Sequence, residues 1–316
     1  MSIRFEGKTA VITGAGSGLG RSYALHLAAL GANVVVNDTG VATDGTGGSD
    51  RPAQAVVEEI INNGGKAIAS VDDVSSRDGA ANLVAQTTQH FGAVDIVVCN
   101  AGVLRDRSFL RMPLDDFEFV LRVHLLGSTY VVKAALPQMM KKGYGRIVLT
   151  TSTSGLYGCH GQTGYSSAKL AIVGLMKSLR IESAAANVCI NTIAPLAVTR
   201  QTQWIFANGM RQAFSPHSVA AMVAYLCSEL CVTSGDVIVA GAGHYAKAEV
   251  FQSRGYGFEP DDITAEQIAE RFGEITDMQD ASTFSSGREA LRAMASSHRT
   301  GQKPVVPAGV ESESGE

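Results

Sequence analysis

The strongest constraint on the fold is a regular alternation of two kinds of segment along most of the chain. From Lys8 onward, short runs rich in β-branched residues alternate with longer segments that are apolar along one stripe. Short apolar runs of this kind indicate buried parallel strands, and parallel strands need crossover helices between them. The alternation predicts an α/β fold with one doubly wound, seven-stranded parallel sheet and helices on both faces. The predicted strands are Thr9–Thr13, Asn33–Asp38, Ala67–Val71, Asp95–Asn100, Arg146–Ser152, Val188–Ala194 and Val237–Ala240. The predicted helices are Leu19–Leu30, Pro52–Asn63, Arg77–Phe91, Leu114–Lys142, Thr163–Ala186 and His217–Ser228.

Other segments depart from this alternation. Gly40–Asp50 is rich in Gly, Thr and Asp, so we expect a mobile loop that is too polar to pack. Residues 197–215 follow the sixth predicted strand and should form a flap at the carboxyl edge of the sheet, where ligands bind. The expected organisation is a single catalytic domain over 1–245, a helical extension over 246–295 with a helix at Thr264–Ile275, and a disordered tail over 296–316.

Composition narrows the class of ligand. Charged residues are 18% of the chain and the formal net charge is -4, so the basic surface needed for nucleic-acid binding is missing. No apolar run approaches the ~18 residues of a membrane span, and the first residues carry no apolar signal-peptide core. We therefore expect a cytoplasmic protein with no membrane or nucleic-acid partner. The five cysteines have no C-x-x-C pair, which argues against a disulfide framework or a metal site.

A glycine-rich turn, Thr13 to Gly20, directly follows the first predicted strand and opens the first predicted helix. That position makes it a candidate nucleotide site, because the helix N-terminus offers free N–H groups to phosphates. Glycines permit the tight turn, the close approach of backbone to pyrophosphate and the packing of helix on strand. The candidate contacts here are Gly14, Ser17, Gly18, Leu19 and Gly20.

The ends of the next strands supply further cofactor candidates. Asp38 ends the second strand, where a carboxylate accepts hydrogen bonds from the ribose hydroxyls and repels a 2′-phosphate. NAD is therefore favoured over NADP. Asp73 and Val74 follow the third strand and are candidates for flanking the adenine, with Asp72 as an alternative. After the fourth strand, a small turn that leaves room for the cofactor is formed by Asn100, Ala101 and Gly102.

Tyr165 and Lys169 are the candidates for the reacting centre. At positions i and i+4 they share one face of a predicted helix. A phenol is a poor base at neutral pH, and lowering its pKa by about three units takes about 4 kcal/mol of preferential phenolate stabilisation. Lys169 and the positive nicotinamide of NAD can supply it. Ser152, at the end of the fifth strand, is the candidate for orienting the substrate oxygen, with Thr151, Thr153 and Ser154 as alternatives.

Together these residues resemble the short-chain dehydrogenase/reductase family over roughly residues 5 to 245. The resemblance implies a Rossmann-like fold in which Ser152 orients an alcohol and Tyr165 takes its proton. Lys169 then binds the nicotinamide ribose and lowers the tyrosine pKa. The matching residues are Thr13 to Gly20, Asn100 to Gly102, Ser152, Tyr165, Lys169 and Asn191 to Pro195, and Pro195 and Val198 are further cofactor candidates.

The sequence departs from the family pattern in two places. His124 stands where the family usually has an Asn that joins a water relay to the lysine, so we keep His124 as a catalytic candidate. If the relay uses the helix carbonyl, a histidine serves as well as an asparagine; if not, the proton must leave another way. After Pro195 the usual Gly is Leu196, and the usual Thr five residues past the proline is Arg200.

Several short stretches of sequence resemble one branch of the family more specifically. This branch contains the dehydrogenase part of peroxisomal multifunctional enzyme type 2, also called 17β-hydroxysteroid dehydrogenase type 4, and its stand-alone bacterial relatives. That branch implies oxidation of a 3-hydroxyacyl-CoA to the 3-ketoacyl-CoA, with the hydratase and sterol-carrier domains expected to be absent. The stretches are Val36 to Asp38, Val103 to Phe109, Val123 to Leu125, Tyr144 to Ile147, Ser154 to Gly158 and Asn191 to Pro195.

Substrate contacts are predicted in the flap and near the reacting serine. Trp204, Phe206 and Met210 are apolar in a segment otherwise expected to be polar, which suits an acyl or steroid surface, and Ser154 is a further candidate. Two alternatives stay open: a 17β-hydroxysteroid dehydrogenase acting on free steroid, and a catalytically silent NAD-binding scaffold or sensor. The family pairs its long helices between subunits, so the resemblance implies a homo-oligomer, a dimer or a tetramer.

Overall fold

The computed structural model describes residues 2–199, 202, 212–258 and 263–300. The chain divides into two compact units, Met1–Ala248 and Glu249–Glu316. The first unit is built on one sheet with the strand order β3-β2-β1-β4-β5-β6-β7-β8. The strands are β1 (Thr9–Thr13), β2 (Asn33–Asn37), β3 (Lys66–Ser70), β4 (Ile96–Cys99), β5 (Gly145–Thr150), β6 (Val188–Leu196), β7 (Val237–Gly241) and β8 (His244–Ala248).

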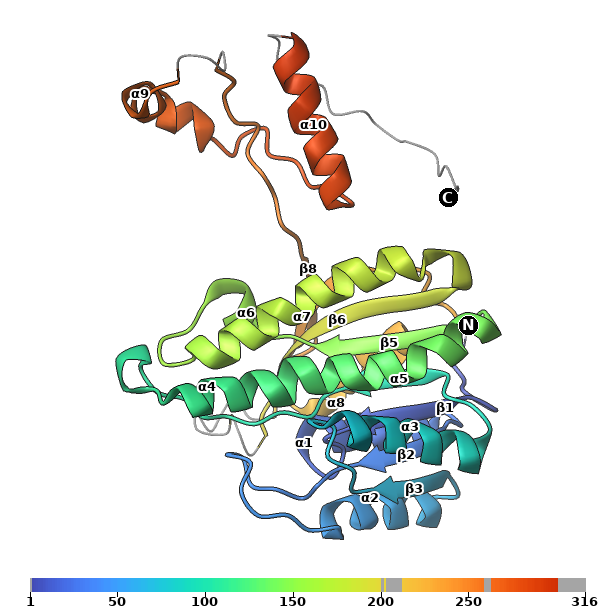
Figure 1. Ribbon diagram of the computed structural model, residues 1–316. Coiled ribbons are helices and arrows are strands. Elements are labelled where there is room, and N and C mark those ends of the chain that lie inside the picture. The colour runs from blue at the N-terminus through green and yellow to red at the C-terminus, as the bar shows by residue number, and fades with distance from the viewer. Residues whose placement is uncertain (1, 200–201, 203–211, 259–262, 301–316) are drawn as a thin grey trace. The chain divides into compact units, whose positions relative to one another are not determined.

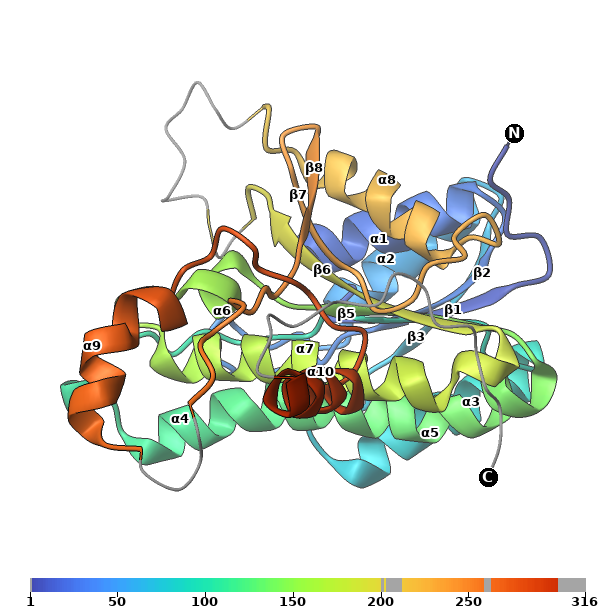
Figure 2. The same ribbon diagram turned by 90° about the horizontal axis from the view of Figure 1, so that it is seen from above.

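Helices cover both faces of this sheet (Figures 1 and 2). One face carries α1 (Gly18–Ala29), α2 (Arg51–Asn62) and α8 (Pro216–Cys227), which share one apolar core with the sheet. The other carries α3 (Arg77–Phe91), α5 (Gly127–Lys142) and α7 (Thr163–Glu182), which form the second core. The short elements are η1 (Phe109–Arg111), α4 (Leu114–Leu121), η2 (Arg122–Leu126), α6 (Thr153–Tyr157) and η3 (Ala184–Ala186).

The expected doubly wound fold is confirmed, but the strand number needs correction. Seven strands are parallel, and an eighth, β8, pairs antiparallel with β7 at the edge. The connecting turn places Ala242 and Gly243 at φ +51° and +73°, as in the two-residue hairpin turns that favour Asn-Gly. The sequence Ala-Gly lacks that signal. Most of β8 is exposed, so its sequence has no alternation of apolar and polar residues that would have predicted a strand.

The long helix expected over Leu114–Lys142 is also interrupted. Residues 122–126 form a π-helical turn, in which Gly127 donates its N–H to the carbonyl of Arg122. Such turns often occur at functional sites. Taken whole, Leu114–Lys142 is long and apolar enough to cross a membrane by length and composition alone. Its side chains Val131, Ala135 and Met139, however, are buried against the sheet, as in the core helix of a globular domain.

Strand register brings the candidate site residues to one edge. Thr13 of β1 pairs with Asn37 of β2, and Ile12 pairs with Val98 of β4. The carboxyl ends of β2, β1 and β4 are therefore level, and the residues that follow them lie side by side. Because the chain leaves β1 toward one side of the sheet and β4 toward the other, a crevice opens between these two strand ends.

In the second unit, α9 (Ala265–Ile275) begins with a capping box: Thr264 accepts the N–H of Gln267, and the Gln267 side chain accepts that of Thr264. The following helix, α10 (Gly287–Thr300), runs past residue 296, where the tail was expected to begin. The rest of that expected tail, 301–316, lies outside the described residues, and its disorder stays a prediction.

All five cysteines are free thiols, and four are buried.

Candidate active site

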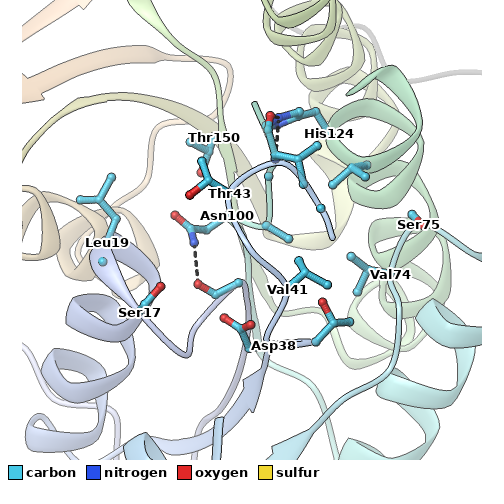
Figure 3. Close-up of a pocket in the computed structure, with 18 of the residues that line it drawn as sticks. Ser17, Leu19, Asp38, Val41, Thr43, Val74, Ser75, Asn100, His124 and Thr150 are labelled. Atoms are coloured by element: carbon cyan, nitrogen blue, oxygen red, sulfur yellow. Dashed lines mark hydrogen bonds between the residues drawn. The ribbon is translucent and has the colours of Figure 1, made fainter. Parts of the chain in front are cut away.

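A cavity of about 510 Å³ opens at the carboxyl edge of the sheet (Figure 3). The segments that follow β1, β2, β3, β4, β5 and β6 all contribute to its wall, so it occupies the crevice between β1 and β4. Fourteen of the catalytic and cofactor-binding residues predicted from sequence line it, and so does Asp72, the alternative to Asp73. The fourteen are Gly14, Ser17, Gly18, Leu19, Asp38, Asp73, Val74, Asn100, Ala101, Gly102, His124, Tyr165, Lys169 and Pro195.

The glycine-rich turn is held by contacts that leave no room for side chains. Gly14 and Gly18 have φ of +63° and +55°, which favour glycine. A Cβ on Gly14 would lie 2.8 Å from the Cα of Ala101. A Cβ on Gly20 would collide with the carbonyl oxygen of Gly14 and the amide of Asn100. Gly20 is therefore needed for packing and is not itself in the cavity lining.

Asn100 joins this turn to the end of β4. Its side-chain amide donates to the carbonyl oxygens of Thr13 and Gly14, both at 3.1 Å. The Thr13 hydroxyl in return accepts the backbone N–H groups of Asn100 and Ala101, both at 3.0 Å. Thr13 lay within the sequence motif without a role assigned to it, and the structure makes it part of the frame of the site.

Asp38, directly after β2, is held by backbone N–H groups on both of its carboxylate oxygens. One of its oxygens accepts the N–H of Gly16 at 2.7 Å, and the other accepts the N–H of Gly40 at 2.7 Å. A Cβ on Gly16 would come within 2.9 Å of the Asp38 carboxyl carbon, so the turn and the carboxylate are in contact. Each oxygen keeps a lone pair, and Asp38 is part of the cavity lining.

The two acidic residues after β3 have different surroundings. The Asp73 carboxylate accepts the N–H and the hydroxyl of Ser75, both at 2.9 Å. Asp72 accepts the hydroxyl of Ser70 at 2.7 Å. Val74 is buried, and its carbonyl oxygen lies close to Gly127 at the start of α5. All three residues line the cavity, so the structure leaves both acids as neighbours of the same pocket.

Tyr165 and Lys169 share one turn of α7, as their spacing predicts. The Lys169 ammonium donates to the carbonyl oxygen of Thr150 at 2.8 Å and lies 5.5 Å from the centre of the Tyr165 ring. Burial lowers the pKa of Lys169 to about 7. Burial also raises the pKa of Tyr165, although a hydrogen bond with Ser152 acts in the opposite direction. The polypeptide alone therefore favours a neutral phenol beside a lysine that is only partly charged at pH 7.

Ser152 and Ser154 are not part of the cavity lining. Ser152 is the N-cap of α6, and its hydroxyl oxygen accepts the N–H of Ser154 at 3.1 Å. The cap fixes Ser152 at the end of the strand and next to the phenol. Thr151, one of the alternatives to Ser152, instead donates its hydroxyl to the carbonyl of Lys169.

His124 is buried in the π-helical turn, with its ring edge-on to Tyr165 at a centroid distance of 5.2 Å. Its Nε2 lies 2.8 Å from the carbonyl oxygen of Val103 and 3.2 Å from the N–H of the same residue, so Nε2 meets a donor and an acceptor and its role depends on the tautomer. Nδ1 has no partner among the described atoms. Burial and the charge of Lys169 lower the pKa of His124 well below its usual value, so the ring is neutral.

The ring of His124 fits because residue 102 is a glycine. A Cβ on Gly102 would collide with the imidazole carbon between the two nitrogens. The carbonyl oxygen of His124 accepts the Ser128 hydroxyl at 2.7 Å. Both relay routes considered from sequence, through the side chain and through the carbonyl, stay predictions.

Several predicted residues do not fall in the lining. Val198 is absent from it, whereas its neighbours Ala197 and Thr199 are present. Trp204, Phe206 and Met210 lie outside the described residues. The lining also contains residues that were not singled out from sequence. Val41, Thr43 and Gly45 come from the loop that was expected to be mobile, Phe119 from α4, Thr150 from the end of β5 and Thr202 from the predicted flap.

Comparisons with known proteins agree on one family. The family model for short chain dehydrogenase matches residues 8–208. A short-chain type dehydrogenase/reductase of Mycobacterium tuberculosis is 45% identical over 276 residues, which cover 87% of this chain and 96% of that protein. Peroxisomal multifunctional enzyme type 2 of Drosophila melanogaster is 42% identical over 291 residues, covering 91% of this chain but 48% of the enzyme. The chain thus spans about half the length of that relative.

Solved structures give the same result. The full-length Drosophila multifunctional enzyme aligns with a TM-score of 0.79 at 34% identity, over 94% of this chain and 51% of that one. A 7α-hydroxysteroid dehydrogenase, solved with NADH and 7-oxo glycochenodeoxycholic acid, aligns with a TM-score of 0.69 at 28% identity, over 76% of this chain and 95% of that one.

The buried Lys169 should make the stability of the cofactor-free protein depend on pH. Its pKa is about 7 in the folded chain and near 10.5 when exposed, so the unfolded chain binds more protons between these values. The free energy of unfolding should therefore rise with pH over this range, by up to ~1.4 kcal/mol per unit. Lys169→Met should remove this rise, as measured by urea unfolding at pH 7 to 9.5. Lys133→Met, at an exposed lysine of α5, is the control for loss of one positive charge. An unchanged pH slope in Lys169→Met would contradict the assignment.

Proposed function

Because the chain belongs to the short-chain dehydrogenase family, an oxidoreductase family acting on CH–OH groups, we propose that it oxidises a 3-hydroxyacyl-CoA to the 3-ketoacyl-CoA with NAD. The observation that carries the proposal is the similarity to multifunctional enzyme type 2 over 91% of this chain, joined to a cavity that holds Tyr165 and Lys169 together. Further relatives are named peroxisomal hydratase-dehydrogenase-epimerases. Hydration of an unsaturated acyl chain gives a hydroxyl group, which is what a dehydrogenase in the same protein would consume.

The geometry suits a dinucleotide. The glycine-rich turn keeps its backbone free of side chains beside the N-terminus of α1, which favours phosphate binding. Asp38 faces the same cavity and favours the 2′-hydroxyl of NAD over the 2′-phosphate of NADP. When bound, NAD accepts the hydride of the alcohol carbon. Gly14, Ser17, Gly18, Leu19 and the small turn Asn100–Gly102 are the proposed cofactor contacts in the lining, with Pro195 near the nicotinamide end.

The proposed proton acceptor is the hydroxyl oxygen of Tyr165. Because burial raises its pKa in the polypeptide alone, the phenolate needs positive charge close by. Lys169 supplies part of that charge and is the proposed contact for the nicotinamide ribose, while Ser152 is proposed to donate a hydrogen bond to the substrate oxygen. A neutral His124 packs against the Tyr165 ring, and its Nδ1 has no partner among the described atoms, so it is proposed as a positioning group or relay member.

The nature of the alcohol is tested by comparing substrates. Similarity to a 7α-hydroxysteroid dehydrogenase solved with NADH and a steroid keeps a free-steroid dehydrogenase as the second candidate. We expect kcat/KM to be highest for 3-hydroxyacyl-CoA thioesters, including steroid-CoA thioesters. A higher kcat/KM for free 17β-hydroxysteroids would favour the second candidate, and absence of NADH formation with either class would favour an NAD-binding scaffold.

We further propose a cytoplasmic homo-oligomer, a dimer or a tetramer. The long helical stretch Leu114–Lys142 and the helix α7 are the surfaces that pair in this family. On α7, Leu170 and Ile181 are 51% and 52% exposed, so the helix has apolar residues that a second subunit could cover. A monomer at micromolar concentration in light scattering would contradict this proposal.

Tyr165→Phe should abolish most of the activity while preserving the fold and NADH binding, because it removes only the hydroxyl. Loss of a general base typically lowers the rate by about 10² to 10⁴-fold. Lys169→Ala should weaken NAD binding and move the pH dependence of kcat upward, with partial recovery at alkaline pH. The measurement is kcat against pH for the three proteins with a 3-hydroxyacyl-CoA. More than about a tenth of native kcat in Tyr165→Phe would show another proton acceptor, with His124 and His160 the next to test.

Asp38→Ala should narrow the preference for NAD over NADP. We expect the native preference in kcat/KM to be at least about tenfold, an effect of roughly 1.4 kcal/mol that one carboxylate can supply by repelling the 2′-phosphate. Initial rates with both cofactors in native and Asp38→Ala proteins measure this. Equal kcat/KM for NAD and NADP in the native protein would overturn the cofactor assignment.

A further inference from the structure

The segment between Thr39 and Ser49 is an ordered, doubled-back loop in the structure. Ser49 donates its N–H to the carbonyl of Thr39 at 2.9 Å, and Ala42 donates to the carbonyl of Thr46 at 2.8 Å. Gly45, at φ +90°, closes the tip by donating to the carbonyl of Ala42 at 2.9 Å. The expectation that this segment is too polar to pack was wrong, because these turns satisfy its polar backbone groups internally.

The tip of this 39–49 loop is docked on the segment after β4. Leu104 donates its N–H to the carbonyl of Thr43 at 2.9 Å. Gly45 lies against the ring of Phe119 on α4, where an added Cβ would be only 2.7 Å from a ring carbon. Val41, Thr43 and Gly45 are half-buried, and the residues between them are exposed. One side of the loop therefore faces the protein.

Arg105 fastens this contact through three interactions. Its Nε donates to the carbonyl of Asp44 at 3.0 Å, and its guanidinium forms an ion pair with Asp116 of α4 at 2.8 Å. The same guanidinium stacks over the Phe119 ring at 4.0 Å. The side chains of Arg105 and Asp116 are 26% and 19% exposed, which shields the pair from full solvent screening. A planar guanidinium suits all three contacts at once.

The loop crosses the mouth of the crevice. It leaves the sheet after β2 and docks beside the segment that follows β4, and β1 lies between those two strands. The loop therefore spans the carboxyl end of β1, which opens into the glycine-rich turn. Val41, Thr43 and Gly45 line the same cavity as Asp38 and Val74 (Figure 3).

We propose that the 39–49 loop covers the adenosine half of the bound dinucleotide and that Arg105 is the positioning residue that holds this cover on α4. The inference rests on the proposed function, since it takes NAD as the ligand. A dinucleotide bound between Asp38 and Val74 lies beneath the loop, so it leaves only when the tip undocks from Phe119. The contacts of Arg105 with Asp44, Asp116 and Phe119 then control the rate of cofactor release.

The test is the dissociation rate of NADH from the full-length protein, measured by stopped-flow fluorescence with excess NAD as competitor. Arg105→Ala should raise this rate by about fivefold to thirtyfold, the effect of losing a few hydrogen-bonding contacts. Arg105→Lys keeps the charge facing Asp116 but lacks the planar fork, so it should give an intermediate rate. Arg107→Ala, at an exposed arginine two residues further along, is the matched control and should release NADH at the native rate.

A second pair of variants tests the docking of the loop on Phe119 through changes in the loop itself, in case Arg105→Ala folds poorly. Gly45 and Gly47 both have positive φ, of +90° and +78°, so alanine strains the backbone at each. A Cβ at Gly45 meets Phe119, whereas one at Gly47 has no described heavy atom within 4 Å. Gly45→Ala should therefore release NADH faster than Gly47→Ala, and the difference reports on the docking contact alone.

Two readouts separate a cover from a general structural role. With saturating NAD, the single-turnover rate of alcohol oxidation should be unchanged in Arg105→Ala, while NADH dissociation is faster. NADH dissociation within about twofold of native in both Arg105→Ala and Gly45→Ala would overturn the inference while leaving the proposed function intact. If the native protein fails to bind NADH at all, the proposed function itself falls.

Discussion

The site depends on the hydrogen bonds that tie the end of β1 to the end of β4. The Asn100 side-chain amide donates to the carbonyl oxygens of Thr13 and Gly14. The Thr13 hydroxyl accepts the backbone N–H groups of Asn100 and Ala101, which directly follow β4. These bonds satisfy backbone groups that would otherwise be unpaired at the strand ends. They also hold the glycine-rich turn against the sheet, so the N-terminus of α1 points into the crevice.

Burial then sets the electrostatics of the reacting residues. It moves Lys169 and Tyr165 toward their neutral forms, by lowering the pKa of the first and raising that of the second. His124, the third titratable group nearby, is held neutral for the same reason. In the proposed mechanism, Lys169 gives part of the positive charge that a phenolate at Tyr165 needs, and a bound oxidised nicotinamide would give the rest. Proton abstraction would then depend on occupancy of the site by the oxidised cofactor.

Much of this arrangement is predictable from sequence because it follows from local rules. The spacing of Tyr165 and Lys169 fixes their common helix face, and the position of the glycines between strand and helix identifies the turn. The antiparallel β8 was missed because its Ala-Gly turn lacks the usual signal. The π-turn at His124 was missed because helical periodicity barely changes across one extra residue. Docking of the 39–49 loop depends on Arg105 and Phe119, which are distant in sequence and unremarkable in pattern.

Asp38 connects the cofactor site with the loop that covers it. Its two oxygens accept N–H groups from Gly16 in the glycine-rich turn and from Gly40 at the start of the loop. The carboxylate is therefore oriented by the polypeptide before it meets a ribose, which lowers the entropy lost on binding. The same two bonds fix the direction in which the chain leaves β2, toward Leu104 and Arg105 across the crevice. A single acidic residue at the end of β2 thus joins the proposed ribose contact to the start of the loop that is proposed to cover the cofactor.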